Sequence, residues 1–121
     1  MAVGKKLLLW LPALVWMGVI WGFSAQPTLQ ASAIDWQDFL VKKAAHIVEY
    51  FILTSFYLLP FKKSGPFSSR PAVIVAALAA AVFAVLDETH QRFVPGREGR
   101  VRDVAIDSIG IFLAAQASRN W

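Results

Sequence analysis

Long apolar segments alternate with short polar connections along this chain. Apolar helix-length stretches lie at about residues 7–23, 39–61, 71–86 and 103–117, and Gly, Pro and Ser mark the connection KKSGPFSSR at 62–70. A membrane-spanning helix needs roughly 20 mostly apolar residues, and short connections place consecutive helices antiparallel. We therefore predict one all-α integral membrane domain over residues 1–121, built as a four-transmembrane-helix antiparallel bundle.

The first apolar stretch has a second interpretation as a signal peptide. Residues 23–25, Phe-Ser-Ala, loosely imitate a small-residue cleavage site. Phe fits the outer position of such a site badly, and Trp10, Trp16 and Trp21 are unusual in a signal core. A retained membrane anchor is the favoured interpretation.

Composition supports a membrane protein and excludes several kinds of chemistry. Hydrophobic residues make up 57% of the 121 residues, and the five Trp are typical of the headgroup region. Without Cys there is no disulfide, thiolate nucleophile or Cys-ligated metal. The net charge of +4 does not predict nucleic-acid binding, because no basic stripe with interleaved aromatics is present. Membrane lipid is the expected partner of the basic residues.

The distribution of charge predicts cytoplasmic N- and C-termini. Lys5 and Lys6 precede the first helix, whereas the first connection has no basic residue, and basic residues favour the cytoplasmic side. This orientation places every acidic residue on the outer half of the protein: Asp35, Asp38, Glu49, Asp87, Glu88, Glu98, Asp103 and Asp107. We therefore expect a polar site at the outer membrane–water boundary.

Polar residues within the second helix form a stripe. Residues three or four apart share a helix face, so Lys42, His46 and Glu49 should lie in line, with Lys43 beside them. Glu49 lies about 10 Å deeper than Lys42. A charge at that depth is expected to face the bundle interior or water.

The third and fourth helices carry similar polar ends. Asp103, Asp107 and Gly110 share one face, and Glu88 lies above an Ala-rich face. We expect His46, Glu49, Glu88, Asp103 and Asp107 to converge, with Arg97 aimed at them by the Pro95-Gly96 turn.

A purely structural interpretation competes with this one. Buried ion pairs can hold helices together and are weak evidence for stability, and a structural His46 is as reasonable as a functional one. His90 is expected to lie solvated in a loop. The convergence of five ionisable groups from three helices nevertheless exceeds what a bundle requires.

These polar motifs resemble the VanZ-like family, membrane proteins linked to teicoplanin resistance. The family pattern combines Lys-x-x-His and a following aromatic residue with Asp-Glu-x-x-Gln, Pro-Gly-Arg and Asp-x-x-x-(Asn or Asp)-x-x-Gly. The corresponding residues here are Lys43–His46 with Tyr50, Asp87-Glu88–Gln91, Pro95-Gly96-Arg97 and Asp103–Asp107–Gly110. Lys42 departs from the pattern, because many members have an Asp there. The resemblance implies a role in cell-envelope or glycopeptide-antibiotic biology and specifies no reaction.

Three functions fit this pattern. In the first, Lys43, Asp87, Gln91 and Arg97 bind an anionic envelope lipid, wall precursor or glycopeptide. In the second, His46, Glu49, Glu88, Asp103 and Asp107 are the acid–base candidates of a membrane enzyme acting on a lipid-linked substrate. A proton-coupled carrier is the third and least favoured. Carboxylates with one His also suit a divalent metal, but the spacing matches no dedicated metal motif. The pattern leaves the oligomeric state open.

Overall fold

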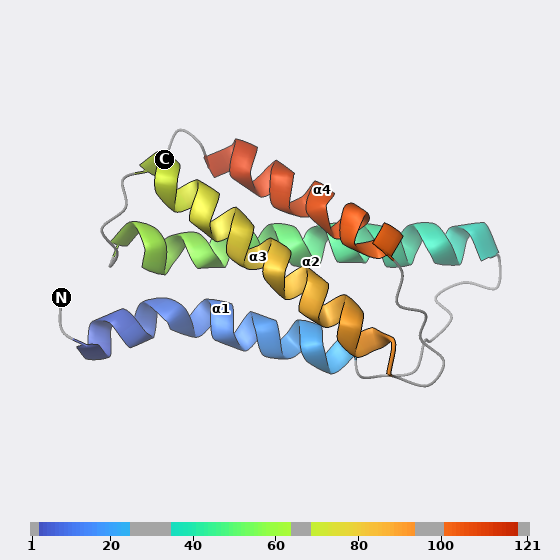
Figure 1. Ribbon diagram of the computed structural model, residues 1–121, viewed down its shortest axis with the longest axis horizontal. Coiled ribbons are helices and arrows are strands. Elements are labelled where there is room, and N and C mark those ends of the chain that lie inside the picture. Colours follow the sequence, from blue (N-terminus) through green and yellow to red (C-terminus); the bar gives the residue numbers. More distant parts are fainter. Residues whose placement is uncertain (1–2, 25–34, 64–68, 94–100, 119–121) are drawn as a thin grey trace.

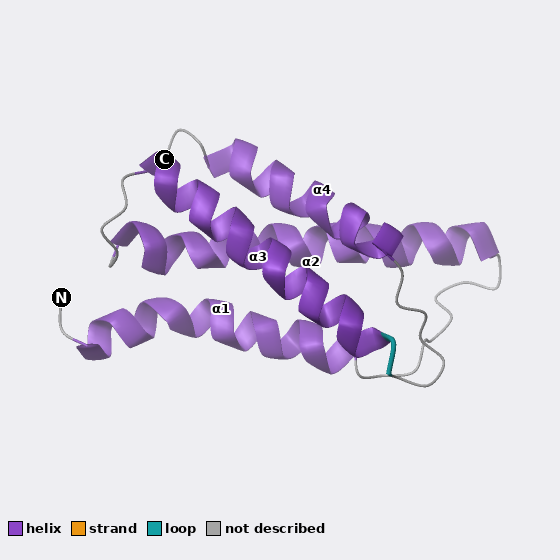
Figure 2. Ribbon diagram, in the orientation of Figure 1, coloured by secondary structure: helices purple, strands orange, loops and turns teal. Residues whose placement is uncertain are grey.

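The computed structural model describes residues 3–24, 35–63, 69–93 and 101–118. It contains four helices, α1 (Val3–Ser24), α2 (Asp35–Lys63), α3 (Ser69–Gln91) and α4 (Val101–Ser118), and the described ranges contain no strand (Figure 2). Consecutive helices run in alternating directions, so α2 and α4 run the same way (Figure 1). The predicted all-helical class is confirmed.

Three of the helices are long and apolar enough to cross a membrane. They are Val3–Phe23, Trp36–Lys63 and Arg70–Gln91. The fourth helix, α4, does not belong to this group, because Arg102, Asp103 and Asp107 occupy its first half. Its 18 residues extend for about 27 Å. The fold is thus compatible with a multi-pass membrane protein.

Two helices continue beyond their apolar segments. The start of α2 at Asp35 precedes the expected residue 39, and the end of α3 at Gln91 lies past the expected residue 86. Lys42 Nζ lies 2.8 Å from Asp38 Oδ2, an i,i+4 pair within the polar start of α2. Such pairs support a helix outside the apolar region. Hydropathy therefore marks the apolar part of these helices and not their ends.

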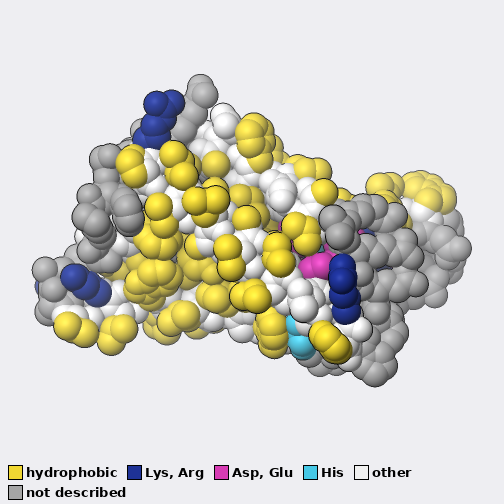
Figure 3. Space-filling view, viewed as in Figure 1, with side chains coloured by type: hydrophobic (Ala, Val, Ile, Leu, Met, Phe, Trp, Pro, Cys, Tyr) yellow, Lys and Arg dark blue, Asp and Glu magenta, His cyan; other side chains and the backbone are white. Residues whose placement is uncertain are grey.

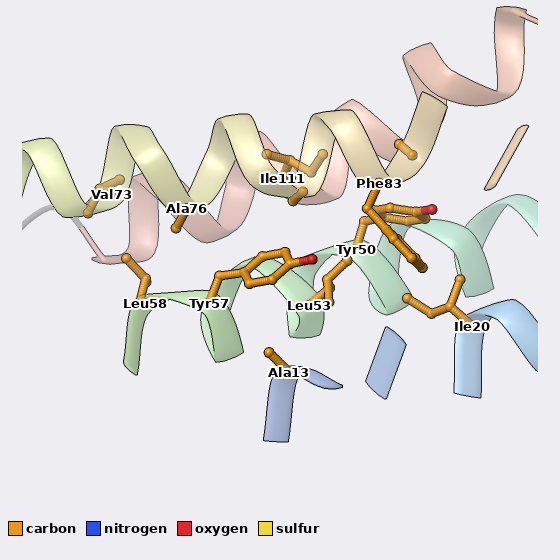
Figure 4. Packing of buried hydrophobic residues seen from close by; sticks show 12 residues of the cluster. Ala13, Ile20, Tyr50, Leu53, Tyr57, Leu58, Val73, Ala76, Phe83 and Ile111 are labelled. Atoms are coloured by element: carbon orange, nitrogen blue, oxygen red, sulfur yellow. The ribbon is translucent and has the colours of Figure 1, made fainter. Parts of the chain in front are cut away.

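Aromatic and small side chains form the core of the bundle. Tyr50, Leu53 and Tyr57 of α2 are buried, and Ala76 of α3 and Ile111 of α4 lie on the opposite side of the same cluster (Figure 4). Alanine keeps the helix faces flat enough for backbones to approach closely. Small residues on α3 and α4 therefore accommodate the large rings of α2.

The first helix packs against this core through aromatic contacts. Trp10 meets Tyr57 and Phe61 edge to face, with ring centroids 6.1 and 5.3 Å away. The Tyr57 hydroxyl donates to Met17 Sδ at 3.2 Å. The remainder of α1 exposes large apolar side chains, and hydrophobic side chains are spread widely over the middle of the visible face (Figure 3). In a bilayer this surface would contact lipid.

Candidate functional site

Two charged pairs connect α2 to α4. Lys43 Nζ pairs with Asp103, and His46 Nδ1 lies 2.8 Å from Asp107 Oδ1. All four side chains are mostly buried. When Asp107 is ionised it can only accept hydrogen bonds, so Nδ1 of His46 is then the donor in this pair. In the neutral ring that leaves Nε2 with a lone pair.

The spacing of these residues follows from the shared direction of α2 and α4. Lys43 meets Asp103, and one turn later His46 meets Asp107. Another turn along, Gly110 lies against the backbone of Ile47, where any Cβ would overlap the carbonyl oxygen. The Lys-x-x-His and Asp-x-x-x-Asp-x-x-Gly motifs are thus the two sides of one parallel helix contact.

Asp87 links α3 to α2. Asp87 is 1% exposed. Its Oδ2 atom accepts hydrogen bonds from the Tyr50 hydroxyl at 3.3 Å and from Gln91 Nε2 at 3.5 Å. Tyr50 is fully buried. These two donors fix the orientation of the Asp87 carboxyl group, which sits beside the α2–α4 pairs.

Glu88 also belongs to this end of the bundle. It is buried, and the charges of Asp103, Asp107 and Arg92 all act on it. Its Oε1 atom has no hydrogen-bond partner among the residues that the structure describes. With Asp87, Asp103 and Asp107, it makes four buried acids that come together from α3 and α4.

We define the polar cluster as the side chains that meet where α2, α3 and α4 converge. It consists of Lys43, His46, Tyr50, Asp87, Glu88, Gln91, Asp103 and Asp107.

The buried polar face of α2 is not made by the three residues that the sequence predicted, Lys42, His46 and Glu49. It runs through Lys43, His46 and Tyr50, whereas Lys42 turns aside to pair with Asp38. Glu49 is only half-buried, and its backbone oxygen accepts a 2.9 Å hydrogen bond from Trp16 Nε1. Its charge still acts on His46. Glu49 therefore lies beside the polar cluster, on the side of α1.

Two further expectations concern Arg97 and a metal. Arg97 and the Pro95-Gly96 turn lie outside the described residues. Within the described ranges, no three His, Asp or Glu side chains are grouped so as to hold a metal ion.

The positions of two side chains, Tyr50 and His90, were not predicted from the sequence. Tyr50 entered only as a motif aromatic, although its position four residues after His46 places it on the same face. His90 lies in the last turn of α3, not in a solvated loop, and its ring stacks on Trp21 at 4.0 Å with an angle of 4° between the planes. No spacing rule within one helix predicts a contact between α1 and α3.

These features define a helical, membrane-compatible protein with an ionisable cluster buried between three of its helices. The chain matches the VanZ/LLP1 family over residues 8–119, nearly its whole length, and it belongs to that family. The resemblance carried by its polar motifs is thereby confirmed. No curated protein and no solved structure matches the chain.

Proposed function

We propose that the polar cluster of this VanZ-like membrane protein binds the headgroup of an anionic cell-envelope lipid, wall precursor or glycopeptide. Lys43 and Arg97 would contact the phosphate or carboxylate of this ligand. Asp87 and Gln91 would contact its polar neighbours. Arginine can grip such an anion through two parallel hydrogen bonds.

The observation that carries this proposal is the pair of charged contacts between α2 and α4. Lys43–Asp103 and His46–Asp107 are mostly buried next to two further buried acids, Asp87 and Glu88. Apolar residues of similar size commonly stabilise a protein as well as a buried ion pair does. Ionisable residues within membrane helices are accordingly associated with function. Arrangement of these groups for ligand binding explains their presence better than bundle stability alone.

The proposal includes a membrane orientation. We propose that α4 spans the bilayer as the fourth helix, with its charged first half at the interface beside α2 and α3. Lys5, Lys6, Lys62, Lys63 and Arg70 gather at the ends of α1–α3 that lie away from the polar cluster. The other side carries as many basic residues, six against six when Arg119 is counted, so the proposed orientation follows the first helix, which has Lys5 and Lys6 before it and no basic residue in the connection after it. On this proposal both termini are cytoplasmic and the polar cluster lies at the outer boundary.

The His46–Asp107 contact favours a second candidate function. A carboxylate bonded to Nδ1 orients a His ring and leaves Nε2 available for proton transfer, an arrangement common in general acid–base catalysis. The protein would then convert a lipid-linked substrate, with Glu49, Glu88 and Asp103 assisting. A proton-coupled carrier remains the least supported alternative.

Incubation of the purified protein with a lipid-linked wall precursor distinguishes binding from catalysis. Mass spectrometry would measure both the retained ligand and any product. Retention that falls in the Arg97→Gln variant, without product, is the expected result. Product formation abolished by His46→Gln would favour the enzyme. Asp38→Asn is the matched control, because Asp38 pairs with Lys42 and neither residue is part of the polar cluster as defined above. Absence of both retention and product would contradict the proposed function.

A further inference from the structure

Glu88 is a buried acid whose hydrogen bonding the described residues leave incomplete. The residue is 5% exposed, and its Oε1 atom finds no hydrogen-bond donor in the described part of the chain. The charges of Asp103, Asp107, Arg92 and Asp87 all act on its carboxyl group, so that group belongs to the polar cluster. Buried carboxyl oxygens are rarely left without a donor, and a ligand can supply one.

The charge balance of the polar cluster indicates which kind of donor fits. Lys43 is engaged by Asp103, and His46 is engaged by Asp107. Arg92 is a further described cation, and its charge acts on Glu88. The polar cluster nevertheless brings together four buried acids, Asp87, Glu88, Asp103 and Asp107, and its own basic side chains are Lys43 and His46. A cationic group is favoured there.

An ammonium group fits this position better than a metal ion does. A metal needs several ligands around one point, and no three His, Asp or Glu side chains of the described residues are grouped in that way. A primary ammonium has three N–H donors and needs no fixed coordination geometry. It can satisfy Glu88 while its other hydrogens point towards neighbouring acids.

We infer that Glu88 recognises a protonated primary amine on the bound ligand. The ligand would thus combine an amine with an anionic group, which the proposed function assigns to Lys43 among the described residues. Aminophospholipids and amine-bearing wall precursors share this chemistry. The inference rests on the proposed function, and it narrows the class of ligand.

Native mass spectrometry of the full chain in detergent tests the inference. The protein would be mixed with equal amounts of phosphatidylethanolamine, phosphatidylcholine and phosphatidylglycerol. We expect at least tenfold greater retention of phosphatidylethanolamine, because the quaternary nitrogen of phosphatidylcholine has no N–H and phosphatidylglycerol has no amine. A soluble muramyl peptide with a free amine would then be added. If it displaces the bound phosphatidylethanolamine, the amine-bearing ligand is a wall precursor, and if the lipid stays bound, the ligand is a phospholipid.

Variants of Glu88 connect the preference to this side chain. Glu88→Gln should abolish the preference for phosphatidylethanolamine over phosphatidylglycerol, whereas Asp38→Asn should leave that preference unchanged. Glu88→Asp keeps the charge and should keep part of the preference, which covers the case that the Gln variant does not fold. A preference that survives in folded Glu88→Gln would overturn the inference.

The possible failures are distinguishable. Equal retention of all three lipids by the wild type contradicts the amine inference and leaves the proposed function standing. Retention of neither lipid nor precursor contradicts both.

Arg97 provides a further test, since it could itself neutralise Glu88. In that case the Tm of Glu88→Gln/Arg97→Gln would equal that of the less stable single variant, because contacting residues are not additive. The inference expects the two decreases in Tm to add.

Discussion

The His46–Asp107 pair leads to a direct prediction for a single substitution. Asp107→Asn leaves His46 facing a neutral amide in a buried position. Loss of one partner of a buried ion pair costs about 3–5 kcal/mol, so we expect a large decrease in thermal stability. Glu49→Gln should change stability far less, because Glu49 is half-buried whereas Asp107 is buried. Thermal unfolding in detergent measures both, and equal losses would place Glu49 in the polar cluster.

Arg97 is the second residue with a specific expectation. It follows the Pro95-Gly96 turn of the family motif, whereas Arg100 lies in a run of basic residues. Arg97→Lys keeps the charge but loses the planar guanidinium fork. We expect at least tenfold weaker binding of the anionic ligand in Arg97→Lys and unchanged binding in Arg100→Lys. Equal tolerance of the two changes would make Arg97 an ordinary surface charge.

At the scale of the element, Gly110 determines how closely α4 approaches α2. A Cβ at this position would overlap the Ile47 carbonyl oxygen and lie 3.0 Å from the Phe51 backbone nitrogen. Backbone atoms cannot rotate away, so Gly110→Ala should destabilise the protein by about 1–3 kcal/mol. It should also weaken ligand binding by separating Lys43 and His46 from their acids.

Gly18→Ala is the matched control for this change. A Cβ at Gly18, on α1, would meet nothing within 4 Å. Since Ala is the better helix former by roughly 1 kcal/mol, Gly18→Ala should be neutral or slightly stabilising. Similar losses of unfolding free energy in the two variants would refute a close α2–α4 contact as the cause.

The elements also show where prediction from sequence succeeds and where it stops. The four helices follow from the apolar segments, and the family motifs identify most residues of the polar cluster. The sequence does not show which face of α2 is buried against α4. Lys42 and Lys43 are adjacent, and only packing decides that Lys43 is the one that meets Asp103. The Trp21–His90 stack joins two helices through a contact that neither helix's periodicity encodes. Periodicity thus predicts faces, whereas the pairing of faces requires the tertiary structure.

At the scale of the whole molecule, the polar cluster and the basic helix ends lie at opposite ends of the bundle. The start of α1, the end of α2 and the start of α3 carry Lys and Arg residues. The described acids other than Glu49, which lies in the middle of α2, are found near the starts of α2 and α4 and the end of α3. Figure 1 shows these two groups of helix ends on opposite sides of the view. The first helix usually dominates the orientation, and Lys5 and Lys6 precede it while the first connection has no basic residue. On this ground we expect the polar cluster to face outward.

Cysteine labelling tests this orientation without interference, because the chain has no Cys. Ser64 follows α2 at the basic end, and Gly96 lies in the connection between α3 and α4. In intact cells, a membrane-impermeant maleimide should label Gly96→Cys and leave Ser64→Cys unlabelled until the membrane is permeabilised. Labelling of Ser64→Cys alone would invert the protein and place the polar cluster at the cytoplasmic face. Labelling of both would mean that the two connections share one side, which three or four alternating spans do not permit.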